Sequence, residues 1–229
     1  MYQQHIVLDF EMNPVSEQER EVKRYLAREI IEIGAVRLDA NAEVTDRFQC
    51  YVKPQFNDRI TQTIRELTGI GYAQTNSAES FSEAMGLFAA WIGTERTRVY
   101  SWSMSDLYQL EDECDYKEID IPESMYRWVD LQAIFPRFLR QKSYRRLALQ
   151  NAAKVCGIEV DRTKVHGALY DAEVTARLLQ LILDGSYRKL VQFQNEAICK
   201  EVSHTTQSLA QASGGALQQL LEKLRAEEA

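Results

Sequence analysis

Two acidic residues two positions apart are the first feature of this sequence that could do chemistry. Asp9 and Glu11 directly follow a short apolar run, residues 6–8, that is typical of a buried strand. Side chains two apart on a strand point to the same face, so the two carboxylates would lie close together. A cation between them would relieve their repulsion. Surface acids at the end of a strand would give the same pattern, so the pair alone is a weak signal.

Two further segments place chemically useful side chains at the start of a helix. Asp106 lies where a strand pattern ends and a helix pattern begins, and His166 precedes a strongly amphipathic helix whose first turns contain Asp171. Each also has an ordinary structural explanation, because an acid suits a helix N-terminus and a histidine before a helix is usually structural. The other histidines, His5 and His204, occupy no comparable setting.

The three segments together fit phosphodiester hydrolysis by two metal ions. Such a site needs several oxygen ligands around two cations roughly 4 Å apart, and magnesium prefers carboxylates. One ion would help to generate the attacking hydroxide, and the other would stabilise the leaving 3′ oxygen. An imidazole that titrates near neutrality can take the proton from the attacking water. The sequence therefore predicts four metal-binding carboxylates and one histidine base, namely Asp9, Glu11, Asp106, Asp171 and His166.

The elements expected around these residues form an α/β arrangement. Strand patterns cover residues 6–11, 29–38, 44–53, 98–102 and 127–129. Helix patterns cover residues 60–67, 80–92, 106–116, 131–139, 147–155 and 168–183. Ser80 and Glu83 have the spacing of a capping box. Three strands followed by helices that alternate with two more strands predict a mixed five-stranded sheet flanked by helices.

The end of the chain differs in composition from the rest. Residues 186–229 are helical in pattern but poorer in core residues, and a Gly-Gly pair at 214–215 interrupts them. We expect a catalytic domain over residues 1–184 and a helical C-terminal extension over 185–229. The extension could cover apolar surface or pair between chains as a homo-oligomer contact.

Composition and charge limit the class of protein. The formal net charge of −7 argues mildly against a protein that coats long nucleic acid, but not against an enzyme that holds one strand end. The four cysteines lie far apart, which indicates neither a zinc site nor a disulfide framework. Because no signal peptide and no membrane-spanning run is seen, we expect a cytoplasmic protein without a membrane partner.

Two charged stretches have simple explanations. Residues 111–123 contain seven acids and only Lys117 as a base, which favours a solvated face and loop over a site. Residues 137–146 contain five basic residues and no acid. A solvated helix face and a patch that steers a nucleic-acid strand explain this basic stretch equally well.

The three chemical segments resemble the motifs of the DEDDh family of 3′→5′ exonucleases, which includes polymerase proofreading subunits, oligoribonucleases and ribonuclease T. Residues 9–11 match the family's Asp-x-Glu motif. Residues 102–106 match its Trp-Gly-x-x-Asp motif, with Ser103 in place of glycine. Residues 166–172 match its His-Arg-Ala-Leu-x-Asp-Ala motif, with Gly167 in place of arginine. Neither departure replaces a metal ligand.

The resemblance covers residues 4 to about 184 and narrows the branch. Residues 29–36 look like the KapD sporulation-inhibitor group and the histone-mRNA and small-RNA 3′ exonucleases. The family implies a ribonuclease-H-like fold, two Mg²⁺ or Mn²⁺ ions on the four carboxylates, and His166 and Glu11 as catalytic side chains. It also implies a pocket for the 3′ nucleotide, lined by Phe10, Met12, Thr68, Gly69, Ile70, Trp102 and Ser103.

The function implied is a 3′→5′ exonuclease that releases nucleoside 5′-monophosphates from single-stranded RNA or DNA. A catalytically idle domain of the same fold that binds nucleic acid or a partner is the alternative from a different class. Another ribonuclease-H-like enzyme, such as an endonuclease, is a third, although those usually lack a histidine five residues before the last aspartate. The sequence leaves open the choice between RNA and DNA, the substrate length, the pathway and the oligomeric state.

Overall fold

The structure, a computed structural model, describes residues 2–138, 146–161 and 163–185. A mixed five-stranded sheet in the order β3-β2-β1-β4-β5 forms its centre. β1 pairs antiparallel with β2 and parallel with β4. The strands are β1 (Gln4–Pro14), β2 (Arg28–Asp39), β3 (Val44–Tyr51), β4 (Thr97–Ser101) and β5 (Trp128–Asp130). This arrangement confirms the sheet predicted from the sequence.

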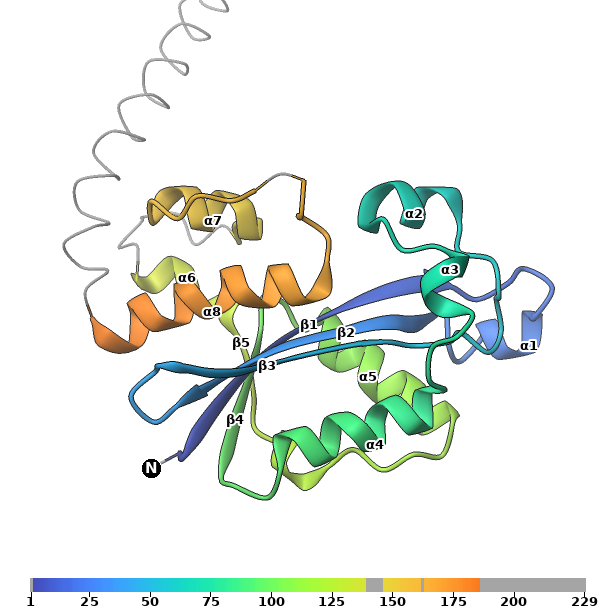
Figure 1. Cartoon of the computed structure of the whole chain (residues 1–229), viewed down its shortest axis with the longest axis horizontal. Helices are drawn as coiled ribbons and strands as arrows, with labels where there is room; N and C mark the ends of the chain where they lie inside the picture. Colours follow the sequence, from blue (N-terminus) through green and yellow to red (C-terminus); the bar gives the residue numbers. More distant parts are fainter. Residues whose placement is uncertain (1, 139–145, 162, 186–229) are drawn as a thin grey trace, which may run out of the picture.

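Helices cover both faces of the sheet (Figure 1). One layer consists of α4 (Phe81–Ile92) and α5 (Ser105–Tyr116), and the other of α6 (Leu131–Phe138), α7 (Leu149–Val155) and α8 (Ala168–Asp184). Shorter elements are α1 (Arg20–Lys23), α2 (Gln62–Thr68), α3 (Tyr72–Thr75) and the 3₁₀ turn η1 (Glu123–Met125). α1 lies within residues 13–28, which the sequence predicts to be a charged loop with partial helical character. α3 was not expected from the sequence, because four residues are too few to show a helical period.

Alternation along β1 divides its side chains between the two layers. Ile6, Leu8 and Phe10 belong to the core that packs on α4 and α5, whereas Val7 belongs to the core under α6, α7 and α8. Asp9 and Glu11 share the parity of Val7, so they face the layer that contains α8. β1 therefore presents both carboxylates toward the start of that helix.

The predicted capping box at the start of α4 is confirmed. The Ser80 hydroxyl accepts a hydrogen bond from the Glu83 amide at 3.3 Å, and a Glu83 carboxylate oxygen accepts one from the Ser80 amide at 2.9 Å. The pair satisfies amides at both the cap and the first turn. Local sequence thus determines where this helix begins.

The interpretation of residues 111–123 as wholly solvated is wrong for Glu113. Its side chain is fully buried and accepts hydrogen bonds from the Ile30 amide at 2.8 Å and from Lys117 Nζ at 2.7 Å. Lys117 also lies 3.1 Å from the buried Glu29 on β2. Burial raises the pKa of Glu113, and Lys117 opposes that rise. The cluster of Glu29, Glu113 and Lys117 fastens α5 to β2.

Several sequence expectations meet the limits of the described residues. The C-terminal extension and residues 139–145 of the basic stretch lie outside them. Of the basic stretch, Arg146 contacts Asp130 at 3.4 Å. Cys50, Cys114 and Cys156 are free thiols. Among the described helices, none combines the length and the apolar character that crossing a bilayer requires.

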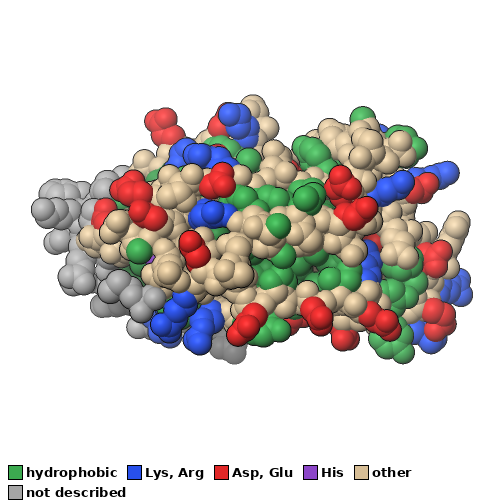
Figure 2. Space-filling model, turned by 60° about the horizontal axis from the view of Figure 1, so that its bottom comes forward, with side chains coloured by type: hydrophobic (Ala, Val, Ile, Leu, Met, Phe, Trp, Pro, Cys, Tyr) green, Lys and Arg blue, Asp and Glu red, His purple; other side chains and the backbone are tan. Residues whose placement is uncertain are grey.

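The surface does not separate its charges on the face that Figure 2 shows. Acidic and basic side chains are interspersed there, with hydrophobic side chains exposed between them. This face therefore offers no single-signed surface for a long polyanion.

Candidate metal centre

Three carboxylates from two elements converge at one point. An oxygen from each of Asp9, Glu11 and Asp171 lies within 4.8 Å of the others. Asp9 and Glu11 come from β1, and Asp171 comes from the first turn of α8. Partly buried carboxylate oxygens at this spacing are the ligands that Mg²⁺ and Mn²⁺ prefer. The donor set therefore fits a divalent cation.

Asp106 approaches this cluster from the opposite helical layer, although it is not one of the three carboxylates that lie within 4.8 Å of one another. It lies in the first turn of α5 with only 4% of its surface exposed. One of its carboxylate oxygens accepts a hydrogen bond from the Phe10 amide, 3.1 Å away. Since Phe10 separates Asp9 from Glu11, this bond holds Asp106 beside the other three acids. Its side chain therefore reaches β1 and does more than suit the N-terminus of α5.

The cluster brings several acidic groups together in a largely buried environment. Burial raises the pKa of Asp9 well above its ordinary value, and the nearby Asp106 raises it further. Burial, with Glu32 next in importance, raises the pKa of Glu11 to about 8. Burial raises the pKa of Asp106 to about 7 against the hydrogen bond from Phe10. Without a cation, such a cluster retains protons at neutral pH, and a divalent ion would displace them.

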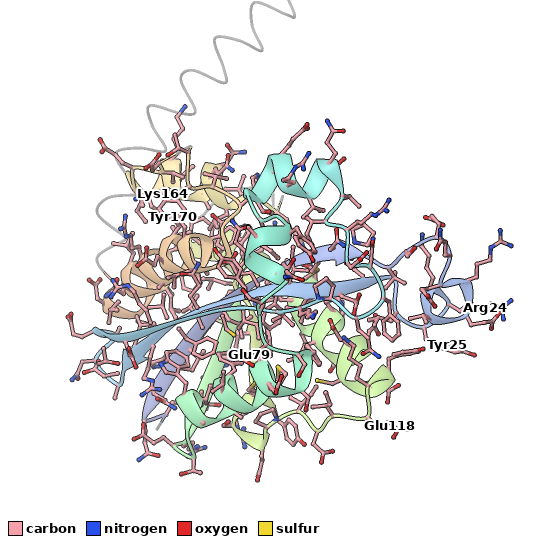
Figure 3. The ribbon with its side chains drawn as sticks, turned by 45° about the vertical axis from the view of Figure 1, so that its right-hand side comes forward. Arg24, Tyr25, Glu79, Glu118, Lys164 and Tyr170 are labelled. Atoms are coloured by element: carbon pink, nitrogen blue, oxygen red, sulfur yellow. The ribbon has the colours of Figure 1, made fainter. Side chains whose placement is uncertain are left out.

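His166 lies next to the cluster in an unusual backbone conformation. Its φ of 66° falls in the left-handed region, which few residues other than glycine adopt. Hydrogen bonds hold the loop before α8 on both sides of His166. The Gly167 amide donates to the Lys164 carbonyl at 3.2 Å, and the Asp161 amide donates to the Tyr170 hydroxyl at 2.6 Å. Figure 3 labels Lys164 on this loop and Tyr170 on α8.

His166 also affects one acid of the cluster. Burial raises the pKa of Asp171, and the neighbouring His166 lowers it. His166 and Asp171 also line the same hollow, where a general base for a metal-bound water would have to lie.

A hollow of about 330 Å³ contains all five chemical side chains. Its lining is Asp9, Phe10, Glu11, Met12, Arg28, Ile64, Leu67, Trp102, Ser103, Ser105, Asp106, Leu149, His166 and Asp171. Four of the seven residues expected around the 3′ nucleotide are therefore here. The other three lie just beyond the C-terminal end of α2 or at it.

The segment of Thr68, Gly69 and Ile70 shapes the hollow without lining it. The Thr68 hydroxyl donates to the Ile64 carbonyl at 2.9 Å and accepts from the Ile70 amide at 3.0 Å. Gly69 caps α2 at a φ of 74°, and Ile70 is 2% exposed. The segment thus ends α2, the helix that contributes Ile64 and Leu67 to the lining.

Four lining residues were not found by sequence reasoning: Arg28, Ile64, Ser105 and Leu149. Leu67 belongs to the segment 67–70, which the family resemblance sets against the terminal nucleotide. Among the four, Arg28 is the basic side chain of the hollow, and it lowers the pKa of Asp106. Leu67 is 46% exposed although it is a large apolar residue. The helical spacing of Ile64 and Leu67 was a usable signal, because an i, i+3 pair shares one helix face.

Trp102 forms a rigid wall of this hollow. Its indole N–H donates to the Leu147 carbonyl at 3.0 Å, and its ring packs edge-on against Phe135 at 5.3 Å. Only 7% of its surface is exposed. Because both its polar and its apolar parts are held, the wall does not depend on a ligand for its position.

A comparison with known families agrees with this geometry. The model of the RNase_T exonucleases matches residues 6–179. The chain belongs to the RNase_T exonuclease family. This result confirms the resemblance to the DEDDh 3′→5′ exonuclease family that the three motifs carry.

Two vertebrate proteins are similar to this chain in sequence. ERI1 exoribonuclease 2 of Danio rerio is 30% identical over 226 residues, which cover 89% of this chain and 39% of the relative. ERI1 exoribonuclease 2 of Homo sapiens is 29% identical over 220 residues, which cover 86% of this chain and 31% of the relative. The chain thus spans 31–39% of the length of these two relatives.

A solved structure shares the fold. The nuclease domain of 3′hExo, described as a DEDDh family member bound to rAMP, superimposes with a TM-score of 0.69 at 22% identity. The match covers 82% of this chain and 94% of that domain. It confirms that the sheet and its helices form a ribonuclease-H-like exonuclease fold.

Proposed function

We propose that this member of the exonuclease family is a metal-dependent 3′→5′ exonuclease that acts on single-stranded nucleic acid and releases nucleoside 5′-monophosphates. The observation that carries the proposal is the convergence of Asp9, Glu11 and Asp171 beside Asp106 and His166 in one hollow. These residues come from β1, from α5, from α8 and from the loop before α8. A pair of surface acids or an isolated helix cap would not bring side chains from all these elements together.

Four carboxylates would hold two divalent cations, Mg²⁺ or Mn²⁺. Asp9, Glu11 and Asp171 supply oxygens around one point, and Asp106 approaches from the other side of β1. When bound, the cations polarise the phosphoryl oxygens, lower the pKa of the attacking water and stabilise the leaving oxygen. The hard oxygen donors and the raised carboxylate pKa values both fit this occupant.

His166 would take the proton from the attacking water at a ring nitrogen. The water oxygen then bonds to phosphorus, the bond from phosphorus to the 3′ oxygen breaks, and the shortened strand leaves with that oxygen. The released nucleotide retains the phosphate on its 5′ carbon. His166 must be neutral to accept this proton.

The walls of the hollow suggest how a strand end would be held. Met12, Ile64 and Leu67 form an apolar surface for the terminal base. Arg28 has no acidic partner within 4 Å among the described ion pairs, so its guanidinium remains available to a phosphate of the strand. Phe10, Trp102 and Ser103 complete the nucleotide pocket, with Thr68, Gly69 and Ile70 supporting α2 behind it.

The class of strand is also part of the proposal. The two vertebrate relatives are named exoribonucleases, so RNA is the substrate to test first, with DNA beside it. A cytoplasmic location and a domain boundary near residue 184 stay predictions. The assembly predicted through the C-terminal helices lies outside the described residues and also stays a prediction.

The proposal is tested by digestion of 5′-labelled RNA and DNA oligomers with free or blocked 3′ ends. We expect stepwise shortening of the free oligomers with Mg²⁺ or Mn²⁺, and none with EDTA or with Asp9→Ala. Cleavage of 3′-blocked oligomers at internal positions would instead indicate an endonuclease. Binding without cleavage under all metal conditions would indicate the idle binding domain.

A further inference from the structure

A fifth carboxylate lies beside the metal centre, and the proposed reaction does not use it. Glu32 on β2 stands directly opposite Glu11 in the β1–β2 pairing and is 2% exposed. One of its oxygens accepts a hydrogen bond from the Ala168 amide at 3.0 Å, and the other accepts one from Gln49 Nε2 at 2.6 Å. Both oxygens therefore face N–H donors, and Glu32 is not one of the three carboxylates that converge within 4.8 Å.

The hydrogen bond to Ala168 meets a need at the start of α8. The first amides of a helix have no partner within the helix, and a side chain at the N-cap usually accepts from one of them. Here the N-cap is Gly167, which has no side chain to do so. Glu32 supplies the acceptor from 136 residues away in the sequence, and its negative charge also suits a helix N-terminus.

The same stretch of β2 touches the backbone of α8 directly. A Cβ atom on Gly34 would lie 2.0 Å from the Leu169 nitrogen and 2.2 Å from the Ala168 carbonyl carbon, so only glycine fits there. Glu32 and Gly34 are two apart on the strand and face the same side. Close contact at one residue and a charged hydrogen bond at the other thus fix the start of α8 on the sheet.

Two site residues flank this point of attachment. His166 ends the preceding loop, and Asp171 lies in the first turn, where its amide donates to the Gly167 carbonyl at 2.9 Å. His166 holds a φ of 66°, which a non-glycine residue retains only where its surroundings impose it. A displaced helix start would therefore move His166 and Asp171 away from Asp9 and Glu11 on β1.

We infer that Glu32 is a positioning residue of the metal centre, which caps α8 through the Ala168 amide and thereby places Asp171 and His166 against β1. The inference rests on the proposed exonuclease function. Glu32 also lies close enough to the site to raise the pKa of Glu11, and it does so more than any other charged group. A purely structural carboxylate would instead affect folding and leave the chemistry of each folded molecule unchanged.

The test compares Glu32→Ala, Glu32→Gln and the control Gln49→Ala in the full chain. Gln49→Ala removes the other partner of Glu32 but leaves the bond to Ala168. The measurements are hydrogen exchange of the first α8 amides, Mn²⁺ affinity by calorimetry, and kcat and KM on a 5′-labelled RNA oligomer.

For Glu32→Ala we expect faster exchange at the Ala168 amide and a loss of roughly 10–100-fold in Mn²⁺ affinity or kcat, which is the usual effect of removing a residue that orients ligands. KM should change little, because Glu32 does not line the hollow. Glu32→Gln keeps an acceptor and should restore most of the loss, and Gln49→Ala should resemble the wild type.

A folded Glu32→Ala protein with wild-type kcat and Mn²⁺ affinity would overturn the inference. An impaired Glu32→Gln protein whose Ala168 amide stays protected would also overturn it, because the charge and not the position would then be responsible. Should Glu32→Ala fail to fold, Glu32→Met, which fills the space without an acceptor, takes its place in the same measurements. If the wild type hydrolyses nothing, the proposed function fails, and the exchange and Mn²⁺ measurements still decide the role of Glu32.

Discussion

Replacing Glu11 with glutamine should stabilise the metal-free protein near pH 8 although it removes a proposed metal ligand. In the folded protein, burial and the neighbouring acids raise the pKa of Glu11 to about 8 from an ordinary value of 4.5. The folded state therefore binds more protons than the unfolded state between these two values. The contribution of protonated Glu11 to the free energy of unfolding is fully present below pH 4.5 and is lost as the pH rises through 8.

The size of the effect follows from the two pKa values. At about 1.4 kcal/mol for each pKa unit, Glu11 costs on the order of 4 kcal/mol of folding free energy at pH 8 relative to pH 4. Glutamine has the shape of glutamate and carries no charge, so it avoids this cost. For a domain of this size, the melting temperature should rise by roughly 8–16 °C in EDTA at pH 8.

The melting temperatures of the wild type and of Glu11→Gln are measured by circular dichroism from pH 5 to 8, in EDTA and in Mn²⁺. The metal-free wild type should lose stability toward pH 8, and Mn²⁺ should restore it because it binds the deprotonated carboxylates. Glu11→Gln should show a flatter pH dependence and little stabilisation by Mn²⁺. A variant less stable than the wild type in EDTA at pH 8 would refute the reasoning, since the repulsion within the cluster would then be absent.

Three further predictions concern the base, the strand and the tail. His166→Ala should lower kcat roughly 10²–10⁴-fold with Mn²⁺ affinity little changed, measured per folded molecule, and near wild-type turnover would end its role as the base. Arg28→Ala should weaken binding of an RNA oligomer in Ca²⁺ and reduce the salt dependence of that binding. The control Arg96→Ala, just before β4, should change neither. Equal effects of the two variants would mean that net charge alone determines binding. Deletion after Gly185 should change stability or oligomeric state and spare hydrolysis, and loss of activity in a folded truncation of unchanged assembly would contradict this.

The parts of the site that could be predicted are those that local pattern determines. Asp9 and Glu11 follow an apolar run with strand spacing, and Asp106 and Asp171 lie in first helical turns. Each of these positions can be found from a window of about ten residues. Their meeting at one place needed the combination of all three segments, because no window contains more than two of them.

The parts that could not be predicted depend on contacts between distant segments. The role of Glu32 requires the register of β1 on β2 and the docking of α8, which is 136 residues away. Glu113 looked solvated among neighbouring acids, because counting charges does not show that it is buried beside Lys117 and the Ile30 amide. Leu149 reaches the hollow only through the packing of α7, which its local sequence does not determine.

Digestion of matched RNA and DNA oligomers with free 3′ ends, in Mn²⁺ and then in EDTA, tests the central claim most directly. We predict a ladder of products that shortens one nucleotide at a time from the 3′ end, release of nucleoside 5′-monophosphates, and complete loss of both with EDTA or with Asp9→Ala. Undiminished hydrolysis in EDTA, or in a folded Asp9→Ala protein, would contradict the assignment of these carboxylates as the metal centre.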